Sequence, residues 1–232
     1  MSEIKVGGVE KFSAVDFPEK LTAVVFMQGC PWKCPFCHNA SIRDLTKEND
    51  FSWELWVNFL KSRVGKLDAV TFSGGEPLMQ DCLADAISEV KDLGFAIGLH
   101  TGGYNPKNLE KVLPLVDWVG LDIKAPFEKL PYQKIVGVNH LSQVEQSLDL
   151  LLKSGVDFEC RTTCDPRFLT SDDLINIAKY LKQRGVKKYF LQKYRPIETD
   201  KTTTDSDCEN IFNNQNLIEY CKNNFAKFEI RR

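Results

Sequence analysis

The sequence predicts an α/β fold, a partial (βα)6 barrel in which parallel strands alternate with helices. Three observations predict it. Six apolar runs have the length of buried strands, helix-patterned stretches lie between most of them, and a glycine follows several of these stretches as a stop signal. The chain has 232 residues, which suits one domain of this kind. We therefore expect a single domain over residues 1–232, with its chemistry on the loops after the strands.

The expected strands are short and rich in apolar and β-branched side chains. They cover residues 21–27, 68–72, 95–100, 118–123, 158–162 and 188–192. The segment 1–20 is expected to add an edge hairpin. The segment 197–232 is expected to hold a loop, a helix and a short final strand at 227–230.

The clearest helical patterns cover residues 53–64, 81–93, 143–153 and 171–184. Thr170 and the acidic residues that follow it form a typical N-terminal cap for the last of these helices. The stretch 198–206 is polar and is predicted to be a mobile surface loop without a functional role.

Composition excludes several classes of protein. Lysine plus arginine number 30 and aspartate plus glutamate 32, so the net charge of −2 excludes a generally basic nucleic-acid-binding protein. No apolar run approaches the roughly 20 residues of a membrane span, and the first residues lack the pattern of a secretory signal. The eight cysteines are therefore expected to be thiols or metal ligands of a cytoplasmic protein that binds neither nucleic acid nor membrane.

Three of the cysteines, Cys30, Cys34 and Cys37, follow the first expected strand in a C-x3-C-x2-C pattern. Three thiolates on one loop can hold three irons of a cubane iron–sulfur cluster, whereas ordinary electron-transfer clusters use four cysteines. The fourth iron would then be open, as in a reacting metal site rather than a structural one.

Other interpretations of this loop explain less of it. A redox pair formed by Cys34 and Cys37 leaves Cys30 without a role. A c-type haem attachment at Cys34–His38 fits poorly in a chain without an export signal. A zinc site would need the adjacent Cys37 and His38 to bind one ion. The remaining cysteines lack metal spacing and are expected to be buried thiols: Cys82, Cys160, Cys164, Cys208 and Cys221.

A second motif, Ser-Gly-Gly-Glu-Pro at residues 73–77, follows the second expected strand. Together with the cysteine loop it resembles the radical SAM enzymes. The resemblance implies a [4Fe-4S] cluster whose open iron binds S-adenosylmethionine (SAM). It implies that Gly74 and Gly75 let the backbone approach the methionine part and that Glu76 meets the ammonium group. It places Phe36 against adenine, with core packing as the alternative, and adds Cys37 and His38 to the SAM contacts.

A closer resemblance covers nearly the whole chain. The segments 12–18 (FSAVDFP), 26–30 (FMQGC) and 37–39 (CHN) resemble anaerobic ribonucleoside-triphosphate reductase activating proteins, in the branch similar to pyruvate formate-lyase activating enzyme. This resemblance implies that Asp122 helps to bind a monovalent cation and that Lys124 faces SAM. It also implies that Arg161 approaches SAM. For Asp122 and Arg161 the alternative is an ion pair at the strand ends.

Two positions depart from this family. The family has Asp-Thr after the third strand, where this chain has His100-Thr101. Thr101 therefore remains an expected SAM contact. The cation site is in doubt, because alkali cations prefer oxygen ligands and the histidine offers none. The late histidine that touches SAM in the pyruvate formate-lyase activases is absent, which leaves Tyr194 or Gln192 for its place.

The resemblance implies an oxidoreductase of anaerobic cells. An electron from a donor such as flavodoxin or ferredoxin would enter the cluster and cleave SAM to a 5′-deoxyadenosyl radical. That radical would generate a glycyl radical on a partner enzyme, with anaerobic ribonucleotide reductase favoured. The alternatives are activation of another glycyl-radical enzyme such as pyruvate formate-lyase, a radical SAM reaction on a small molecule, or an iron–sulfur electron-transfer or sensor module.

Overall fold

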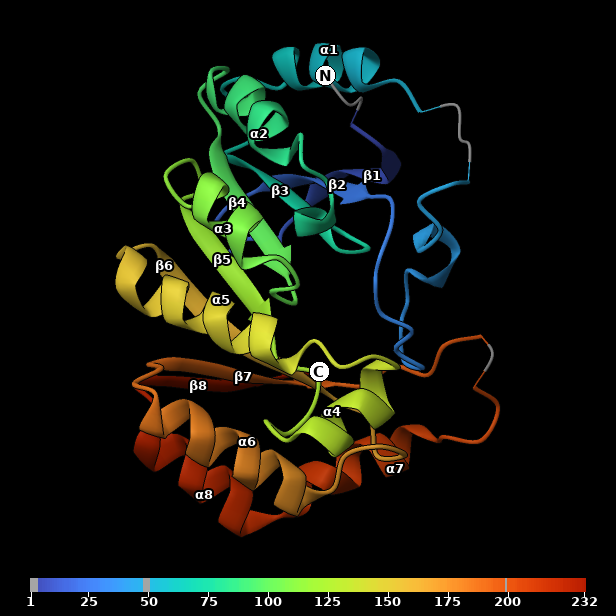
Figure 1. The fold of residues 1–232 in the computed structure, drawn as a ribbon, viewed down its shortest axis with the longest axis vertical. Coiled ribbons are helices and arrows are strands. Elements are labelled where there is room, and N and C mark those ends of the chain that lie inside the picture. Colours follow the sequence, from blue (N-terminus) through green and yellow to red (C-terminus); the bar gives the residue numbers. More distant parts are fainter. Residues whose placement is uncertain (1–3, 48–50, 199) are drawn as a thin grey trace. The chain divides into compact units, whose positions relative to one another are not determined.

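The structure is a computed structural model that describes residues 4–47, 51–198 and 200–232. The contacts within it divide the chain into two compact units (Figure 1). The expectation of one domain over the whole chain stays a prediction. The first unit holds Met1–Pro31, Asn39–Gly120 and Gln143–Asp157, and the second holds Trp32–His38, Leu121–Ser142 and Phe158–Arg232.

The strands of the first unit follow one another in chain order: β1 (Val6–Ser13), β2 (Thr22–Met27), β3 (Ala69–Gly74) and β4 (Ala96–Thr101). The first is antiparallel to β2, which confirms the edge hairpin, and β2, β3 and β4 are parallel. Nearly every residue of β2 is buried, as expected for a parallel strand that is covered on both faces. The next strand, β5 (Trp118–Asp122), runs from the first unit into the second.

Helices connect the parallel strands of the first unit, as the alternating pattern predicts. One helix there is not in the sequence-based prediction, because it is only seven residues long and too short for a clear period. Its start is marked all the same by the Asn105 cap and by Pro106 in its first turn. The helices are α1 (Trp53–Lys61), α2 (Leu83–Lys91), α3 (Pro106–Val112), most of α5 (Leu141–Ser154), and the short 3-10 turns η1 (Ala40–Ile42) and η2 (Pro77–Met79).

The described part of the second unit contains the parallel strands β6 (Asp157–Cys164, whose first residue belongs to the first unit), β7 (Lys188–Lys193) and β8 (Lys227–Arg231). The last of them confirms the predicted final strand. The tail that begins at residue 197 holds two α-helices rather than the single helix expected. The helices of this unit are α4 (Lys129–Val136), α6 (Ser171–Gln183), α7 (Asp205–Asn210), the 3-10 turn η3 (Ile211–Asn213), and α8 (Gln215–Asn224).

Two helices of the second unit begin with the same capping box. The Thr170 hydroxyl accepts the Asp173 N–H (3.2 Å) while the Asp173 carboxylate accepts the Thr170 N–H (2.9 Å), which confirms the predicted cap of α6. Thr204 and Asp207 repeat this arrangement in α7. Residues 198–206 are therefore not simply a surface loop. Asp205 begins a helix, and Asp200 is buried with an exposed fraction of 9%.

The carboxyl ends of β2, β3 and β4 lie at one edge of the first unit because the three strands are parallel and in register. The cysteine loop follows β2, the Gly-Gly-Glu turn follows β3, and the His100-Thr101 pair ends β4. The fold therefore brings the loop ends expected to carry chemistry to the same edge. No helix in the described part of the chain is long and apolar enough to span a membrane.

Candidate functional site

The turn after β3 is hydrogen-bonded to the chain that leaves β2. Gly75 donates its N–H to the Met27 carbonyl (2.9 Å), and Glu76 donates its N–H to the Gly29 carbonyl (2.8 Å). A Cβ at Gly74 would clash with the Met27 backbone, and a Cβ at Gly75 would clash with the Gly29 carbonyl. Gly74 also has φ +112°, which other residues rarely adopt. Both glycines are therefore needed for the two motif-bearing loops to meet.

Both ends of the cysteine loop are anchored in the first unit. At its start, Gly29 and Cys30 donate their N–H groups to the carbonyls of Ile42 (2.8 Å) and Arg43 (3.0 Å). At its far end the Asn39 side-chain amide donates to the Gly74 carbonyl (2.9 Å). Asn39 is part of the quoted CHN segment, yet sequence reasoning assigned it no role. The only signal was a polar residue two positions after the last cysteine, Cys37.

The thiols of the loop differ in exposure. Cys34 is buried, whereas Cys30 and Cys37 are half-buried, and none of the eight cysteines, all of which the structure describes, forms a disulfide. Burial raises the pKa of the Cys34 thiol, and the nearby Lys124 ammonium opposes this effect. The other cysteines match the expectation of buried thiols except for Cys82, which is half-buried; the buried ones are Cys160, Cys164, Cys208 and Cys221.

The assignment of Cys30, Cys34 and Cys37 as cluster ligands stays a prediction. Cys30 belongs to the first unit and the other two to the second. Within the described ranges, no group of three or more His, Cys, Asp or Glu side chains is placed to hold a metal ion. The donor set nevertheless fits an iron–sulfur cluster, because three thiols free of disulfides lie within eight residues of one loop.

The part of the cysteine loop in the second unit rests on α4. Lys33 donates its N–H to the carbonyl of Val136, the last residue of α4 (2.9 Å), and the Cys37 N–H approaches the Cys34 carbonyl (3.3 Å) in a turn. Phe36 is buried, with an exposed fraction of 6%. Core packing therefore describes Phe36 in this structure, and its contact with adenine stays a prediction.

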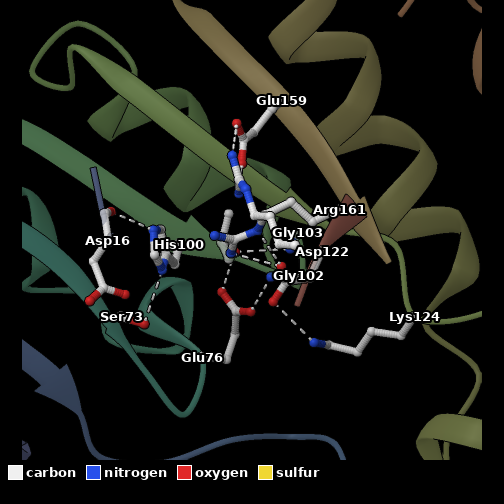
Figure 2. A network of polar contacts seen from close by, with 12 residues as sticks. Asp16, Ser73, Glu76, His100, Gly102, Gly103, Asp122, Lys124, Glu159 and Arg161 are labelled. Carbon is white, nitrogen blue, oxygen red and sulfur yellow. Dashed lines mark hydrogen bonds and ion pairs between the residues drawn. The ribbon is translucent and has the colours of Figure 1, made fainter. Parts of the chain in front are cut away.

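Glu76 and Thr101, both expected at the SAM, contact each other, and Glu76 also contacts Gly102 (Figure 2). The Glu76 carboxylate is buried and accepts hydrogen bonds from the Thr101 hydroxyl (2.5 Å), the Gly102 N–H (2.8 Å) and the Leu78 N–H (3.1 Å). These donors come from the turn after β3, from the last residue of β4 and from the residue that follows it, so the carboxylate is held in one orientation. A carboxylate fixed in this way is suited to accept hydrogen bonds from an ammonium group.

His100 contacts the segment before β2 (Figure 2). Its Nε2 lies 2.8 Å from the Asp16 carbonyl, and its Nδ1 lies 3.5 Å from the Ser73 hydroxyl. Because a carbonyl can only accept, Nε2 carries the hydrogen of this bond. The ring also meets Trp118 edge-on, with a centroid distance of 5.4 Å. His100 therefore connects the FSAVDFP segment to β4.

Asp122, Lys124 and Arg161 form an ion-pair group in the second unit (Figure 2). Asp122 Oδ1 accepts from Arg161 Nη2 (2.7 Å) and Nε (2.9 Å), and Asp122 Oδ2 lies 3.4 Å from Lys124 Nζ. The structure thus contains the strand-end ion pair that was the alternative for Asp122 and Arg161. A monovalent cation at Asp122 would have to share this carboxylate with two cationic side chains. The contacts of all three with SAM stay predictions.

Tyr194 lies beside the cysteine loop, and the choice between Tyr194 and Gln192 for the place of the missing histidine stays a prediction. The Tyr194 ring centroid is 6.5 Å from that of His38, and the side chain is fully buried. Gln192 is half-buried on β7, where it pairs with Thr163 of β6 and Arg231 of β8. Sequence reasoning missed two polar partners of the Tyr194 hydroxyl, Arg167 at 27 positions and Asp200 at 6 positions along the chain.

Comparison with known proteins agrees with this architecture. Residues 24–164 match the Radical SAM superfamily. A glycyl-radical enzyme activating enzyme of Methanocaldococcus jannaschii is 33% identical over 82% of this chain and 80% of its own length. The pyruvate formate-lyase-activating enzyme of Clostridium pasteurianum is 36% identical over 85% of this chain and 84% of its own.

Solved structures show the same fold at low sequence identity. Streptococcus suis SuiB bound to S-adenosylmethionine aligns with a TM-score of 0.66 at 14% identity, over 88% of this chain and 48% of SuiB. This chain therefore spans about half of SuiB. A domain of pyruvate-formate lyase-activating enzyme from Bacteroides vulgatus aligns with a TM-score of 0.54 at 15% identity, over 71% of this chain and 99% of that domain.

The fold and the two motif-bearing loops define a radical SAM enzyme. The chain belongs to the radical SAM superfamily, among the activating enzymes of glycyl-radical enzymes. This confirms the predicted α/β class with the partial barrel of that superfamily, and it confirms that the protein is an enzyme. The family implies a [4Fe-4S] cluster and SAM as cofactors, whereas the individual site residues stay predictions.

Proposed function

We propose that this protein generates the glycyl radical of an anaerobic ribonucleotide reductase. The observation that carries the proposal is the junction of its two motifs, where Glu76 donates its N–H to the Gly29 carbonyl beside Cys30. The resemblance of segments 12–18, 26–30 and 37–39 to the reductase activating proteins supports this partner. A glycyl-radical enzyme as the partner class is supported by the relatives.

The proposed roles follow from the local geometry. Cys30, Cys34 and Cys37 would hold the cluster, and the Glu76 carboxylate would orient the SAM ammonium. When bound, the cluster would supply the electron that cleaves SAM into methionine and a 5′-deoxyadenosyl radical. That radical would take a hydrogen atom from a glycine of the partner. The buried Phe36 would exclude water beside the adenine.

The proposed cationic contacts come from the second unit. Arg161 and Lys124 would face the SAM carboxylate or ribose, with Asp122 holding both side chains in place. Thr101 would act through Glu76, whose carboxylate its hydroxyl already contacts. A flavodoxin or ferredoxin of the anaerobic cytoplasm is the proposed electron donor.

Pyruvate formate-lyase is the second candidate partner. A relative 36% identical to this chain is a pyruvate formate-lyase-activating enzyme, which favours this partner independently of the CHN and FSAVDFP segments. A monovalent cation near Asp122 is part of the proposal for either partner, and it would share the Asp122 carboxylate with Lys124 and Arg161.

The test begins with anaerobic reconstitution with iron and sulfide, followed by reduction and SAM. We expect about four irons per chain, as a cubane requires, and 5′-deoxyadenosine as a product. Cys34→Ala should lose both the iron and the product, with Cys82→Ala as the matched control outside the loop. Full iron content and turnover in Cys34→Ala, or a spectrum that SAM leaves unchanged in the unaltered protein, would contradict the proposal.

The partner is identified by electron paramagnetic resonance. The reduced protein and SAM are mixed in parallel with anaerobic ribonucleotide reductase and with pyruvate formate-lyase. A glycyl-radical doublet is expected with the reductase. A doublet only with pyruvate formate-lyase would support the second candidate. SAM cleavage without a doublet from either enzyme would point to a small-molecule substrate, and no SAM cleavage would favour an electron-transfer or sensor module.

A further inference from the structure

The second unit contains a charged cluster outside the predicted ligand set. Arg167 donates to Asp165 through Nε (3.0 Å) and Nη2 (2.6 Å), and its Nη1 lies 2.8 Å from Asp200 Oδ2. The two carboxylates have side-chain exposures of 0% and 1%. Buried carboxylates of this kind need their hydrogen bonds satisfied, so the single guanidinium holds Asp165 and Asp200 together.

The Tyr194 hydroxyl lies at the centre of this cluster. It accepts from Arg167 Nη2 (2.8 Å) and from the Ile197 N–H (3.3 Å), and it donates to Asp200 Oδ2 (3.1 Å). A phenol has one hydrogen to donate and limited lone-pair capacity. The hydroxyl therefore has its donor and its acceptor positions filled within the protein, and little capacity remains for a ligand.

Asp200 is tied to the chain around it as well. Its Oδ1 accepts the N–H groups of Thr202 and Thr203 (both 3.1 Å) and the Thr202 hydroxyl (3.1 Å). The cluster thus joins the turn after β6, which carries Asp165 and Arg167, to the segment after β7. Burial raises the pKa of Tyr194, so the phenol stays protonated and keeps its donor at neutral pH.

The ring of Tyr194 faces the cysteine loop. Arg167 stacks on one part of the ring, with its guanidinium carbon 4.9 Å from the centroid, and the His38 ring lies 6.5 Å away at a tilt of 55°. Both separations lie within the range of aromatic and cation–π contacts. His38 directly follows Cys37, so the orientation of the Tyr194 ring bears on the position of that thiol.

We propose that Tyr194 is a positioning residue that holds the Cys34–His38 turn through its ring, and that Asp165, Arg167 and Asp200 fix the ring by occupying its hydroxyl. This proposal rests on the proposed function in one respect, the assignment of Cys34 and Cys37 as cluster ligands. It differs from the sequence-based expectation, in which Tyr194 contacts SAM itself.

The test uses Tyr194→Phe, which keeps the ring and removes the hydroxyl, and Tyr194→Leu, which removes the ring. Tyr180→Phe is the matched control, because the hydroxyl of Tyr180, on α6, also accepts from an arginine, Arg184 Nη1 (2.7 Å). Thermal unfolding of each variant shows whether the fold is intact. Asp200→Asn, which keeps Tyr194 itself unchanged, serves as a second route to a released ring.

The first readout is the rate at which iodoacetamide alkylates Cys37 in the metal-free protein. We expect it to rise about threefold or more in Tyr194→Phe, and further in Tyr194→Leu, because local opening exposes the thiol. Asp200→Asn should change it in the same direction, and Tyr180→Phe should leave it unchanged. Equal rates in all the folded variants would overturn the proposal, as would an equal rise in Tyr180→Phe.

The second readout is the midpoint potential of the reconstituted cluster, together with SAM affinity. A shift of potential in Tyr194→Phe with SAM affinity retained supports positioning. Lost SAM affinity with unchanged potential and unchanged alkylation would overturn it in favour of direct SAM contact. If no variant, nor the unaltered protein, takes up a cluster, the proposed function fails, while the alkylation rates still decide the role of Tyr194.

Discussion

The side-chain amide of Asn39 donates to the carbonyl of Gly74 at 2.9 Å and so joins the end of the cysteine loop to the Gly-Gly-Glu turn. The two residues are separated by 35 positions in the sequence. Their contact completes a junction whose other side is the pair of backbone hydrogen bonds that Gly75 and Glu76 donate. The cysteine loop is therefore held at both ends by hydrogen bonds within the protein.

Removal of this amide should loosen the cysteine loop. We expect Asn39→Ala to cost about 1 kcal/mol of unfolding free energy, the usual net value of such a hydrogen bond, and to speed alkylation of Cys37 in the metal-free protein. Urea denaturation and mass spectrometry measure the two effects. Asn213→Ala removes a comparable amide bond at an exposed site, to Asn210 Oδ1 (3.2 Å), and should change neither. An Asn39→Ala protein that matches this control in both measurements would contradict the role given to Asn39.

Gly75→Ala should destabilise the protein. The added Cβ would clash with the Gly29 carbonyl, and backbone of this kind cannot move aside without breaking the hydrogen bond from Glu76. We expect a loss of about 2 kcal/mol or more in urea denaturation, as is usual for overpacking at a buried contact. Gly8→Ala is the matched control, because no atom of the described residues lies within 4 Å of its Cβ position. Equal stability of the two variants would show that the loops do not meet as described.

Glu76→Gln should weaken SAM binding and leave the cluster in place. The amide keeps the shape of the side chain and loses the negative charge that would meet the ammonium group. Isothermal titration of the reconstituted protein with SAM measures the affinity, and iron analysis measures the cluster. Unchanged SAM affinity would count against this role, whereas loss of iron would indicate that Glu76 supports the loop instead.

The thiols should differ in reactivity. Burial raises the pKa values of Cys160, Cys164 and Cys221, the last to about 12, so these thiols stay protonated and shielded at pH 8. Brief treatment of the metal-free protein with iodoacetamide should label the half-buried Cys30 and Cys37 instead, as peptide mass spectrometry can show. Because these pKa values are raised above that of the unfolded chain, the buried thiols stabilise the fold below about pH 8.5 and lose this contribution as the pH rises. Labelling of Cys160 at the rate of Cys37 would contradict the buried placement.

Acid should release the segment that Asp200 holds. Burial alone would raise the pKa of this carboxyl, yet the hydrogen bonds from Thr203, Thr202 and Tyr194 lower it below its ordinary value. A lowered pKa means that the carboxylate contributes stability above about pH 4, and that this contribution is lost as the pH falls further. Asp200→Asn should therefore unfold at a lower urea concentration than the unaltered protein at pH 7. The difference between the two urea midpoints should become smaller at acid pH. A difference between the two urea midpoints that stays constant from pH 7 to pH 3 would contradict this role of Asp200.

The chemistry of the loops was predictable because it depends on the spacing of a few residues that are close together in the sequence. C-x3-C-x2-C places three thiols on one loop, and the strand before Gly74 is visible in a run of β-branched and apolar residues. The short helices α3 and α4 were not predictable in this way. Seven or eight residues give too few turns for a hydrophobic period to stand out.

The sequence by itself determined the α/β class, the order of the strands along the chain and the loops that carry the two motifs. Each of these features depends on residues that lie close together in the sequence, within one helix, one strand or one loop. The tertiary structure alone decided which side chains meet. Arg161 reaches Asp122 across 39 positions, and Arg167 reaches Asp200 although the intervening chain holds a helix and a strand. Such contacts depend on which strand ends come to the same edge of the sheet and on how deeply each polar group is buried, and local spacing specifies neither.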